Sequence, residues 1–465
     1  ARAGLREALA FYAEAVALSG ADDGPARLEL LDAMGRVQLG LGEVAGAARA
    51  FQQAARLLVP GGFRPDAALR AEAHRFAALA LAAAGHLRSA HAEIEEGLAA
   101  AGTADGGAAA PLLHLRAQLL WHEERHLEAR AAAEACVAAA VEGGDADLIA
   151  RGGDMLALAR AAMGAPLTAP DRGPAPGPRD AEAVPVEHPF DVHLSLWDRD
   201  LVSGDAAAVA RLAALHAERA RMRAAPDAVA VARFGEGAAA LALGRLDAAE
   251  AALRDALRGH RAAGFALGEA LALERLAALF TVSGRGDEAL ELIDDGLVVA
   301  ERATLRLHAL TRLHATEARN RLAAGALYAA EDAWREASET AARHGECVSC
   351  DAAFRPEAVR VLLTRGRVAD AEREAAQLEG IAARRGGRVL EAVAATARAR
   401  LGIALGDRGA ALAALAGARV AFADAGQRME AARCARLEAR LARPDEVVCA
   451  EVRALEALVA VDGDA

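Results

Sequence analysis

The sequence predicts an all-α fold in which helical hairpins repeat along the chain and stack into a solenoid, in two arrays. Glycines recur every 40 or 41 residues over the second half of the chain, and a small residue follows each one at a fixed distance. Aromatic residues make up only 3% of the chain, although hydrophobic residues make up 54%, and this argues against a large β-sandwich. A chain of 465 residues also exceeds what one compact core normally serves, which favours a repeat array.

The period is defined by six glycines, at spacings of 40, 40, 41, 41 and 40 residues: Gly204, Gly244, Gly284, Gly325, Gly366 and Gly406. Five residues after these glycines stand Val209 and then five alanines: Ala249, Ala289, Ala330, Ala371 and Ala411. Glycine permits the left-handed backbone that ends the first helix of a hairpin. A small residue one turn into the second helix lets the two helices cross closely.

The N-terminal third, residues 1–163, carries the same pattern less regularly and predicts three to four hairpins. Here the pairs are Gly42 with Ala47, Gly85 with Ala90, and Glu124, in place of glycine, with Ala129. A Pro- and Gly-rich segment, 164–187, then separates this array from a second array, 188–443, of six hairpins. A surface loop within one continuous solenoid is the alternative interpretation of that segment. Residues 444–465 are expected to form a capping helix and tail.

The composition argues against two classes of partner. The formal net charge is −12, and interspersed arginines do not form the basic stripe of a nucleic-acid-binding protein. Charged residues interrupt every apolar run before it reaches the roughly 18 residues needed to cross a membrane. The chain has no basic and apolar leader, and its five cysteines are mostly scattered, so we expect a cytoplasmic protein.

Two segments carry a resemblance to known repeats. Gly244-Arg-Leu-Asp-Ala-Ala-Glu-Ala-Ala-Leu and Gly366-Arg-Val-Ala-Asp-Ala-Glu-Arg-Glu-Ala resemble the second-helix motif of tetratricopeptide (TPR) repeats. The period near 40 is similar to that of bacterial maltose-regulator-type transcription factors. It also resembles the arrays that follow the ATPase module in large actinobacterial signal-transduction ATPases, which often carry LuxR-type or cyclase domains. The resemblance implies a right-handed superhelix and a regulatory role.

The resemblance places any ATPase or output domain outside this chain. The sequence contains no G-x-x-x-x-G-K-[ST] loop and no lysine at all, so a phosphate-binding loop of that kind cannot form. We therefore expect a non-catalytic scaffold for transcriptional regulation or signal transduction. Its concave groove would bind a protein partner, a peptide or a small effector. Self-association into a homo-oligomer is kept as an alternative.

One local cluster contains residues that could bind a metal or undergo redox chemistry: His344-Gly-Glu-Cys347-Val-Ser-Cys350. It lies between the second helix of one hairpin and the first helix of the next, and a helix N-terminus lowers the pKa of a thiol. A single Cys-x-x-Cys is half of a zinc site, so further ligands are needed. The 41-residue register brings His308 of the preceding hairpin to the same height. The predicted site is therefore Cys347, Cys350, His344 and His308, with zinc as the only cofactor considered.

Other interpretations of these residues stay open. The two thiols could be inert, or they could form a reversible disulfide, which would make the chain a redox sensor instead of a metal sensor. His188 and His193 are alternative metal ligands, but they lie four repeats from Cys350 and would need closure of the superhelix or a partner chain.

The remaining histidines and cysteines have more ordinary interpretations. His122 and His126 are four residues apart, a metal-compatible spacing, but a solvated helix face is the simpler expectation. The isolated cysteines are expected to pack as small apolar residues: Cys136, Cys434 and Cys449.

Overall fold

A computed structural model of the chain describes residues 2–20, 23–41, 43–58, 66–83, 86–102, 106–123, 125–162, 204–222, 226–344 and 347–442. Within these ranges every regular element is an α-helix, which confirms the predicted all-α solenoid. The predicted connector at 164–187 and the predicted helix at 444–465 lie outside the described residues.

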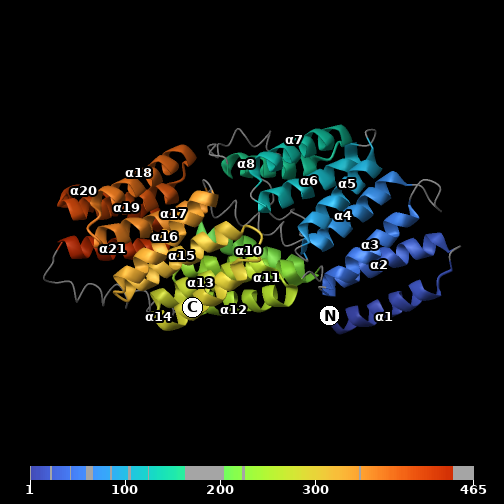
Figure 1. The fold of residues 1–465 in the computed structure, drawn as a ribbon, viewed down its shortest axis with the longest axis horizontal. Helices are drawn as coiled ribbons and strands as arrows, with labels where there is room; N and C mark the ends of the chain where they lie inside the picture. The colour runs from blue at the N-terminus through green and yellow to red at the C-terminus, as the bar shows by residue number, and fades with distance from the viewer. Residues whose placement is uncertain are drawn as a thin grey trace.

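The described part of the N-terminal array has eight helices, and each packs against the next along the chain (Figure 1). Their bounds are α1 (Arg2–Leu18), α2 (Gly24–Leu41), α3 (Val44–Leu57), α4 (Ala67–Ala83), α5 (Leu87–Ala101), α6 (Gly106–His122), α7 (His126–Gly143) and α8 (Ala146–Ala162). Ala47, Ala90 and Ala129 are fully buried within the first two turns of α3, α5 and α7, where these helices face their hairpin partners.

The described part of the C-terminal array begins with a second helix, α10 (Ala206–Met222). Five complete hairpins and one further helix follow: α11 (Pro226–Ala242), α12 (Leu246–Ala263), α13 (Ala266–Val282), α14 (Gly286–Ala300), α15 (Arg306–Ala323), α16 (Leu327–His344), α17 (Val348–Thr364), α18 (Val368–Arg385), α19 (Arg388–Leu405), α20 (Arg408–Asp424) and α21 (Arg428–Ala442).

Five of the six periodic glycines occupy turns within these described hairpins, and the sixth, Gly204, lies just before α10. Their φ angles lie between +59° and +81°, the left-handed region in which an L-residue with a side chain is strained. At Gly244, for example, the turn is closed by the amide of Arg245, which donates to the carbonyl of Ala240 at 2.9 Å. This bond satisfies a helix-terminal carbonyl and reverses the chain.

The small residues after the glycines are buried where paired helices meet. Ala249, Ala289, Ala330 and Ala371 have no exposed surface, and Ala411 is 1% exposed. Each therefore lies inside the contact between the helices of its own hairpin, where a longer side chain would push the two axes apart.

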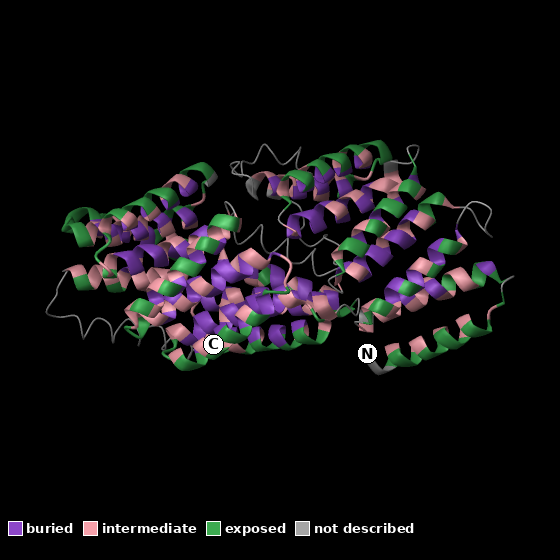
Figure 2. Cartoon of the chain, viewed as in Figure 1, coloured by how far each residue is buried: buried purple, intermediate pink, exposed green. Residues whose placement is uncertain are grey.

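The C-terminal array has an inner and an outer layer. Each first helix packs on the first helix of the next hairpin, in the order α11, α13, α15, α17 and α19, whereas the second helices pack mainly on their hairpin partners. The second helices accordingly carry most of the exposed positions, and buried positions concentrate on the first helices (Figure 2). Helix α13 is buried along most of its length.

The C-terminal array closes on itself. The amide of Ala206, at the start of α10, donates to the carbonyl of Ala425 at 3.1 Å. The side-chain amide of Gln427 donates to the carbonyl of Gly204 at 2.9 Å, and α21 packs on α11. Residues 204–442 therefore form a ring in which the first helices surround the interior.

The two arrays share one apolar core. A single cluster contains Trp121 and Met155 from the N-terminal array together with Leu271 and Leu310 from the C-terminal array. The four side chains are at least 94% buried, so their removal from water stabilises the contact between arrays as well as each array.

Candidate metal centre

The residues of the predicted zinc site come from three consecutive helices. His308 lies in the first turn of α15, His344 is the last residue of α16, and Cys350 lies in the first turn of α17. Cys347 immediately precedes α17, in an extended conformation with φ −131° and ψ 110°. Because α15 and α17 are neighbouring first helices of the inner layer, their first turns lie at the same height.

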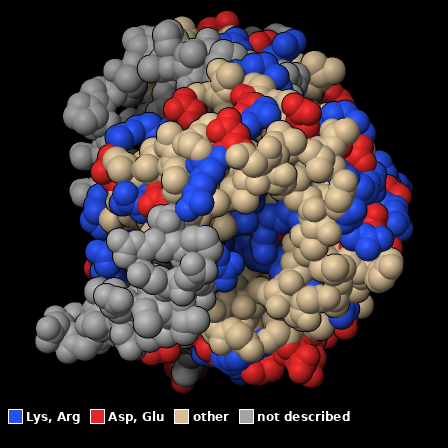
Figure 3. Space-filling model, turned by 90° about the vertical axis from the view of Figure 1, so that its left-hand side faces the viewer, with Lys and Arg blue, Asp and Glu red and all other residues tan. Residues whose placement is uncertain are grey.

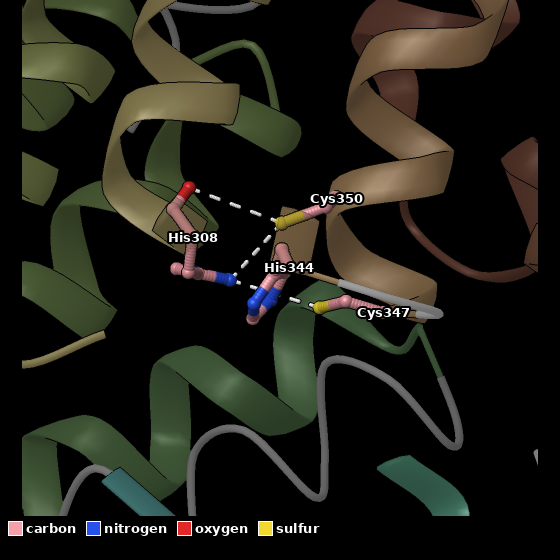
Figure 4. A group of neighbouring side chains, drawn as sticks. All are labelled: His308, His344, Cys347 and Cys350. Atoms are coloured by element: carbon pink, nitrogen blue, oxygen red, sulfur yellow. Dashed lines mark hydrogen bonds between the residues drawn. The ribbon is translucent and has the colours of Figure 1, made fainter. Parts of the chain in front are cut away.

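The four side chains converge on one point (Figure 4). His308 Nδ1 lies 3.1 Å from Cys350 Sγ and 3.7 Å from Cys347 Sγ. The His308 and His344 rings approach edge to face, with centroids 5.8 Å apart. One potential ligand atom from each residue lies within 4.8 Å of all the others.

This geometry is close to what a zinc ion requires. Tetrahedral zinc with Zn–S of about 2.3 Å and Zn–N of about 2.0 Å places its ligand atoms about 3.3 to 3.8 Å apart. The largest separation in the cluster, up to 4.8 Å, would have to shorten by about 1 Å, which a change in side-chain torsion can supply. Two thiolates and two imidazoles also form a donor set that favours zinc over harder cations such as magnesium.

The pKa values of the two thiols are shifted in opposite directions. A hydrogen bond from the Cys350 thiol, together with contacts to His308 and His344, holds the pKa of Cys347 well below its ordinary value despite burial. Burial, then the hydrogen bond with Cys347 and then the charge of Cys347, raise the pKa of Cys350. Both sulfurs bind zinc as thiolates, so metal binding would displace the thiol proton of Cys350 against its raised pKa.

A second contact fixes the two histidine-bearing helices relative to each other. The hydroxyl oxygens of Thr311 and Thr340 lie 3.0 Å apart in a buried position. Thr311 is one turn after His308 on α15, and Thr340 is one turn before His344 on α16. The hydrogen bond thus holds both backbones that carry the histidines, as a preorganised ligand set requires.

The alternative metal ligands and the isolated cysteines named in the sequence analysis lie elsewhere in the chain. His188, His193 and Cys449 lie outside the described residues. Cys136 and Cys434 are at least 99% buried and their thiols are free. Burial raises the pKa of Cys136 to about 12, so this thiol stays protonated and packs as an apolar group.

The prediction of a solvated face for His122 and His126 is wrong for His122. Its side chain has no exposed surface, and its ring lies edge-on to the Trp121 ring with centroids 5.2 Å apart. The reason is tertiary: the end of α6 is covered by the C-terminal array, whose Leu305 amide donates to the His122 carbonyl at 3.0 Å. The two histidines also lie in different helices, His122 at the end of α6 and His126 at the start of α7, so the single helix face that their spacing suggested does not exist.

Comparisons with known proteins identify similar helical repeats but no family. No family model matches the sequence, and no curated protein sequence matches it either. A Rap protein in complex with competence and sporulation factor has a TM-score of 0.41 and 9% identity, over 94% of this chain and 97% of that one. Yeast Tom70 has a TM-score of 0.32 and 12% identity, over 94% and 96%.

The TPR domain of P58(IPK) is a third similar structure, with a TM-score of 0.23 and 13% identity, over 88% of this chain and 98% of that one. All three TM-scores lie below 0.5, so neither the ligands nor the activities of these proteins transfer to this chain. The helical hairpins, their left-handed glycines and their stacked first helices are properties of the chain's own structure.

Proposed function

We propose that this chain is a non-catalytic scaffold of TPR-like repeats that binds a partner on the inner surface of its C-terminal ring. One observation carries the proposal: the first helices from α11 to α21 surround one interior, and a group of charged side chains on them includes Arg400, which has no ion pair with any described residue. Charged residues on inner helices are costly unless they are paired or meet a ligand. The second helices, which face outward, supply the structural support.

The regulatory role is proposed from the repeat motifs. Their similarity to arrays of bacterial ATPase-type regulators supports a place beside a nucleotide-binding module and an output domain in a longer protein. In that role the segment works in the cytoplasm in transcriptional regulation or signal transduction, without itself touching nucleic acid or membrane. Within the described residues no helix is long and apolar enough to span a bilayer. Reading the gene on both sides of this segment tests the role, and flanking sequence without such modules would contradict it.

Hydrogen exchange tests the scaffold directly. The tagged protein is purified from its native cells, the molecules that accompany it are identified, and amide exchange is measured with and without them. We expect protection to concentrate in α11, α13, α15, α17 and α19, because these helices form the inner layer. Protection confined to the second helices, or turnover of a bound molecule, would contradict a scaffold that binds through its interior.

A second candidate function is metal or thiol-redox sensing, favoured by the convergence of His308, His344, Cys347 and Cys350. Metal analysis of the purified protein and a count of reactive thiols distinguish the two versions. About one zinc per chain with both thiols protected supports a metal site, whereas a metal-free protein that loses two thiols on mild oxidation supports a disulfide. Metal-free protein with two unreactive thiols eliminates both versions.

A further inference from the structure

In one group of charged side chains on the first helices of the C-terminal ring, arginines outnumber glutamates. Four arginines occupy successive first helices: Arg319 on α15, Arg360 on α17, Arg400 on α19 and Arg433 on α21. Three glutamates of the first helices act on Arg319: Glu274 on α13, Glu357 on α17 and Glu430 on α21. Arg319, Arg360 and Arg400 follow the repeat, at spacings of 41 and 40 residues, so the same position of three neighbouring hairpins carries a guanidinium.

The pairing of these charges is incomplete. Glu357 accepts from Arg319 Nε at 2.8 Å and also from Arg360, and Glu430 accepts from Arg433. Arg400 makes no hydrogen bond and no ion pair with any residue that the structure describes. Arg400 is half-buried, and the two carboxylates that act on it, Glu357 and Glu430, already accept hydrogen bonds from other arginines. One guanidinium therefore has no carboxylate partner of its own among the described residues.

The charges act on one another across the ring, which places them around one space. Burial raises the pKa of Glu357, but Arg319 on α15, Arg433 on α21 and the other two arginines outweigh it and lower that pKa to about 2. Burial and then the Arg360 charge lower the pKa of Arg400 to about 10. Arg400 is thus still a cation at neutral pH, held in an unfavourable environment that a nearby anion would improve.

One face of the molecule has a recess with basic side chains inside it (Figure 3). Figure 3 shows the face that lies at the left of Figure 1, beside α20 and α21. This face is hollowed, and basic side chains are visible inside the hollow (Figure 3). This is unusual for a chain with a net charge of −12. Positive charge inside a recess with protein walls concentrates anions more strongly than the same charge on an open surface.

We propose that the arginines of α15, α17, α19 and α21 form a binding site for a small polyanion, a ligand with clustered phosphate or carboxylate oxygens. Guanidinium groups bind such oxygens through pairs of charge-assisted hydrogen bonds. Arg400 supplies the primary contact, and Arg360 and Arg433 lie close enough to act on it electrostatically. The inference rests on the proposed scaffold role, since it names the chemical class of what the interior holds.

Two probes test the site and show whether it binds phosphate or carboxylate oxygens. Calorimetric titration of the purified full chain with inorganic pyrophosphate and, separately, with citrate reports phosphate and carboxylate binding. We expect saturable binding of at least one probe, weakening as salt rises, and a loss of about tenfold or more in affinity for Arg400→Gln, because each charge-assisted contact contributes roughly this much. Binding of one probe alone identifies which oxygen chemistry the site accepts.

Matched variants separate a site from general charge. Arg398 lies on the same helix but pairs with Glu379 of the neighbouring outer helix, so Arg398→Gln should leave affinity within about twofold. Glu430→Gln removes a negative charge from the interior and should tighten binding several-fold. The inference is overturned if neither pyrophosphate nor citrate binds. It is also overturned if Arg400→Gln and Arg398→Gln lose the same affinity. Those results leave the hydrogen-exchange test of the scaffold unaffected.

Discussion

The amide of Leu305 donates a 3.0 Å hydrogen bond to the carbonyl of His122, and this bond joins the start of α15 to the end of α6. Leu305 is the one non-glycine residue with positive φ, +50°, among the described residues. A leucine in that conformation costs about 1–2 kcal/mol, which the buried side chain and the contact between arrays offset. His308 follows three residues later, so the same junction positions one ligand of the proposed metal centre.

Removing the Leu305 side chain should destabilise both arrays together. Leu305 is 5% exposed within the core that the arrays share, so Leu305→Ala should lower the free energy of unfolding by about 2–4 kcal/mol. Urea denaturation followed by circular dichroism measures the change. Leu127→Ala is the control, since Leu127 is 66% exposed and should change stability by less than about 0.5 kcal/mol. A second, separate unfolding transition in the wild type would show that the arrays are independent.

Replacing a hairpin glycine should cost stability even where space is available. At Gly325, φ is +74° and a Cβ would meet nothing within 4 Å, so only backbone strain opposes Gly325→Ala, at about 1 kcal/mol. Gly417, an exposed residue inside α20 with equally open surroundings, is the comparison. Gly417→Ala should stabilise the protein by about 0.5–1 kcal/mol. Thermal melts of both variants should therefore shift in opposite directions, and shifts of the same sign would exclude left-handed strain as the cause.

Zinc removal should lower the melting temperature if the four-residue cluster binds the metal. Chelation, Cys350→Ser and His308→Gln should each remove about one zinc per chain and produce similar losses, since a ligand bound only by the folded state stabilises it. Cys136→Ser is the control, because Cys136 is buried elsewhere and should leave zinc content unchanged. A wild-type melting curve that neither zinc nor a chelator moves would count against the metal centre.

Glu357 should make the protein less stable in acid. Its pKa is depressed from the ordinary 4.5 to about 2 in the folded chain, so its stabilising effect is complete above pH 4.5 and is lost as pH falls towards 2. A shift of that size corresponds to roughly 3 kcal/mol. The stability difference between wild type and Glu357→Gln, measured by urea denaturation, should therefore be largest near pH 7 and shrink below pH 4.5. Exposed Glu339→Gln is the control, and a difference independent of pH would show that packing, not charge, is responsible.

Much of the fold could be predicted because its signals are local. Gly244 and Ala249 show this: a left-handed turn and a close helix crossing each depend on a few neighbouring residues, and the same pair recurs in the four hairpins that follow. The repeat register also predicted that His308 would lie at the height of Cys347 and Cys350. Whether the His308 ring turned towards the thiols depended on the packing of α15 against α16 and α17, which no spacing encodes.

The interior of the ring and the junction between arrays could not be predicted in this way. Arg400 and Glu357 are ordinary charged residues in the sequence, and only closure of the ring directs them into one space with Arg433. His122 was misassigned to a solvated face for the same reason, since its covering comes from residues more than 180 positions away.

By itself, the sequence determined the helices, their hairpin turns and the period at which they stack, because these follow from backbone conformations and contacts within about 40 residues. Only the tertiary structure decided that Gln427 returns to Gly204, that α6 packs against the loop before α15, and which charged side chains share an interior. Those outcomes depend on small rotations between successive hairpins, which accumulate over the whole array and leave no local trace in the residues.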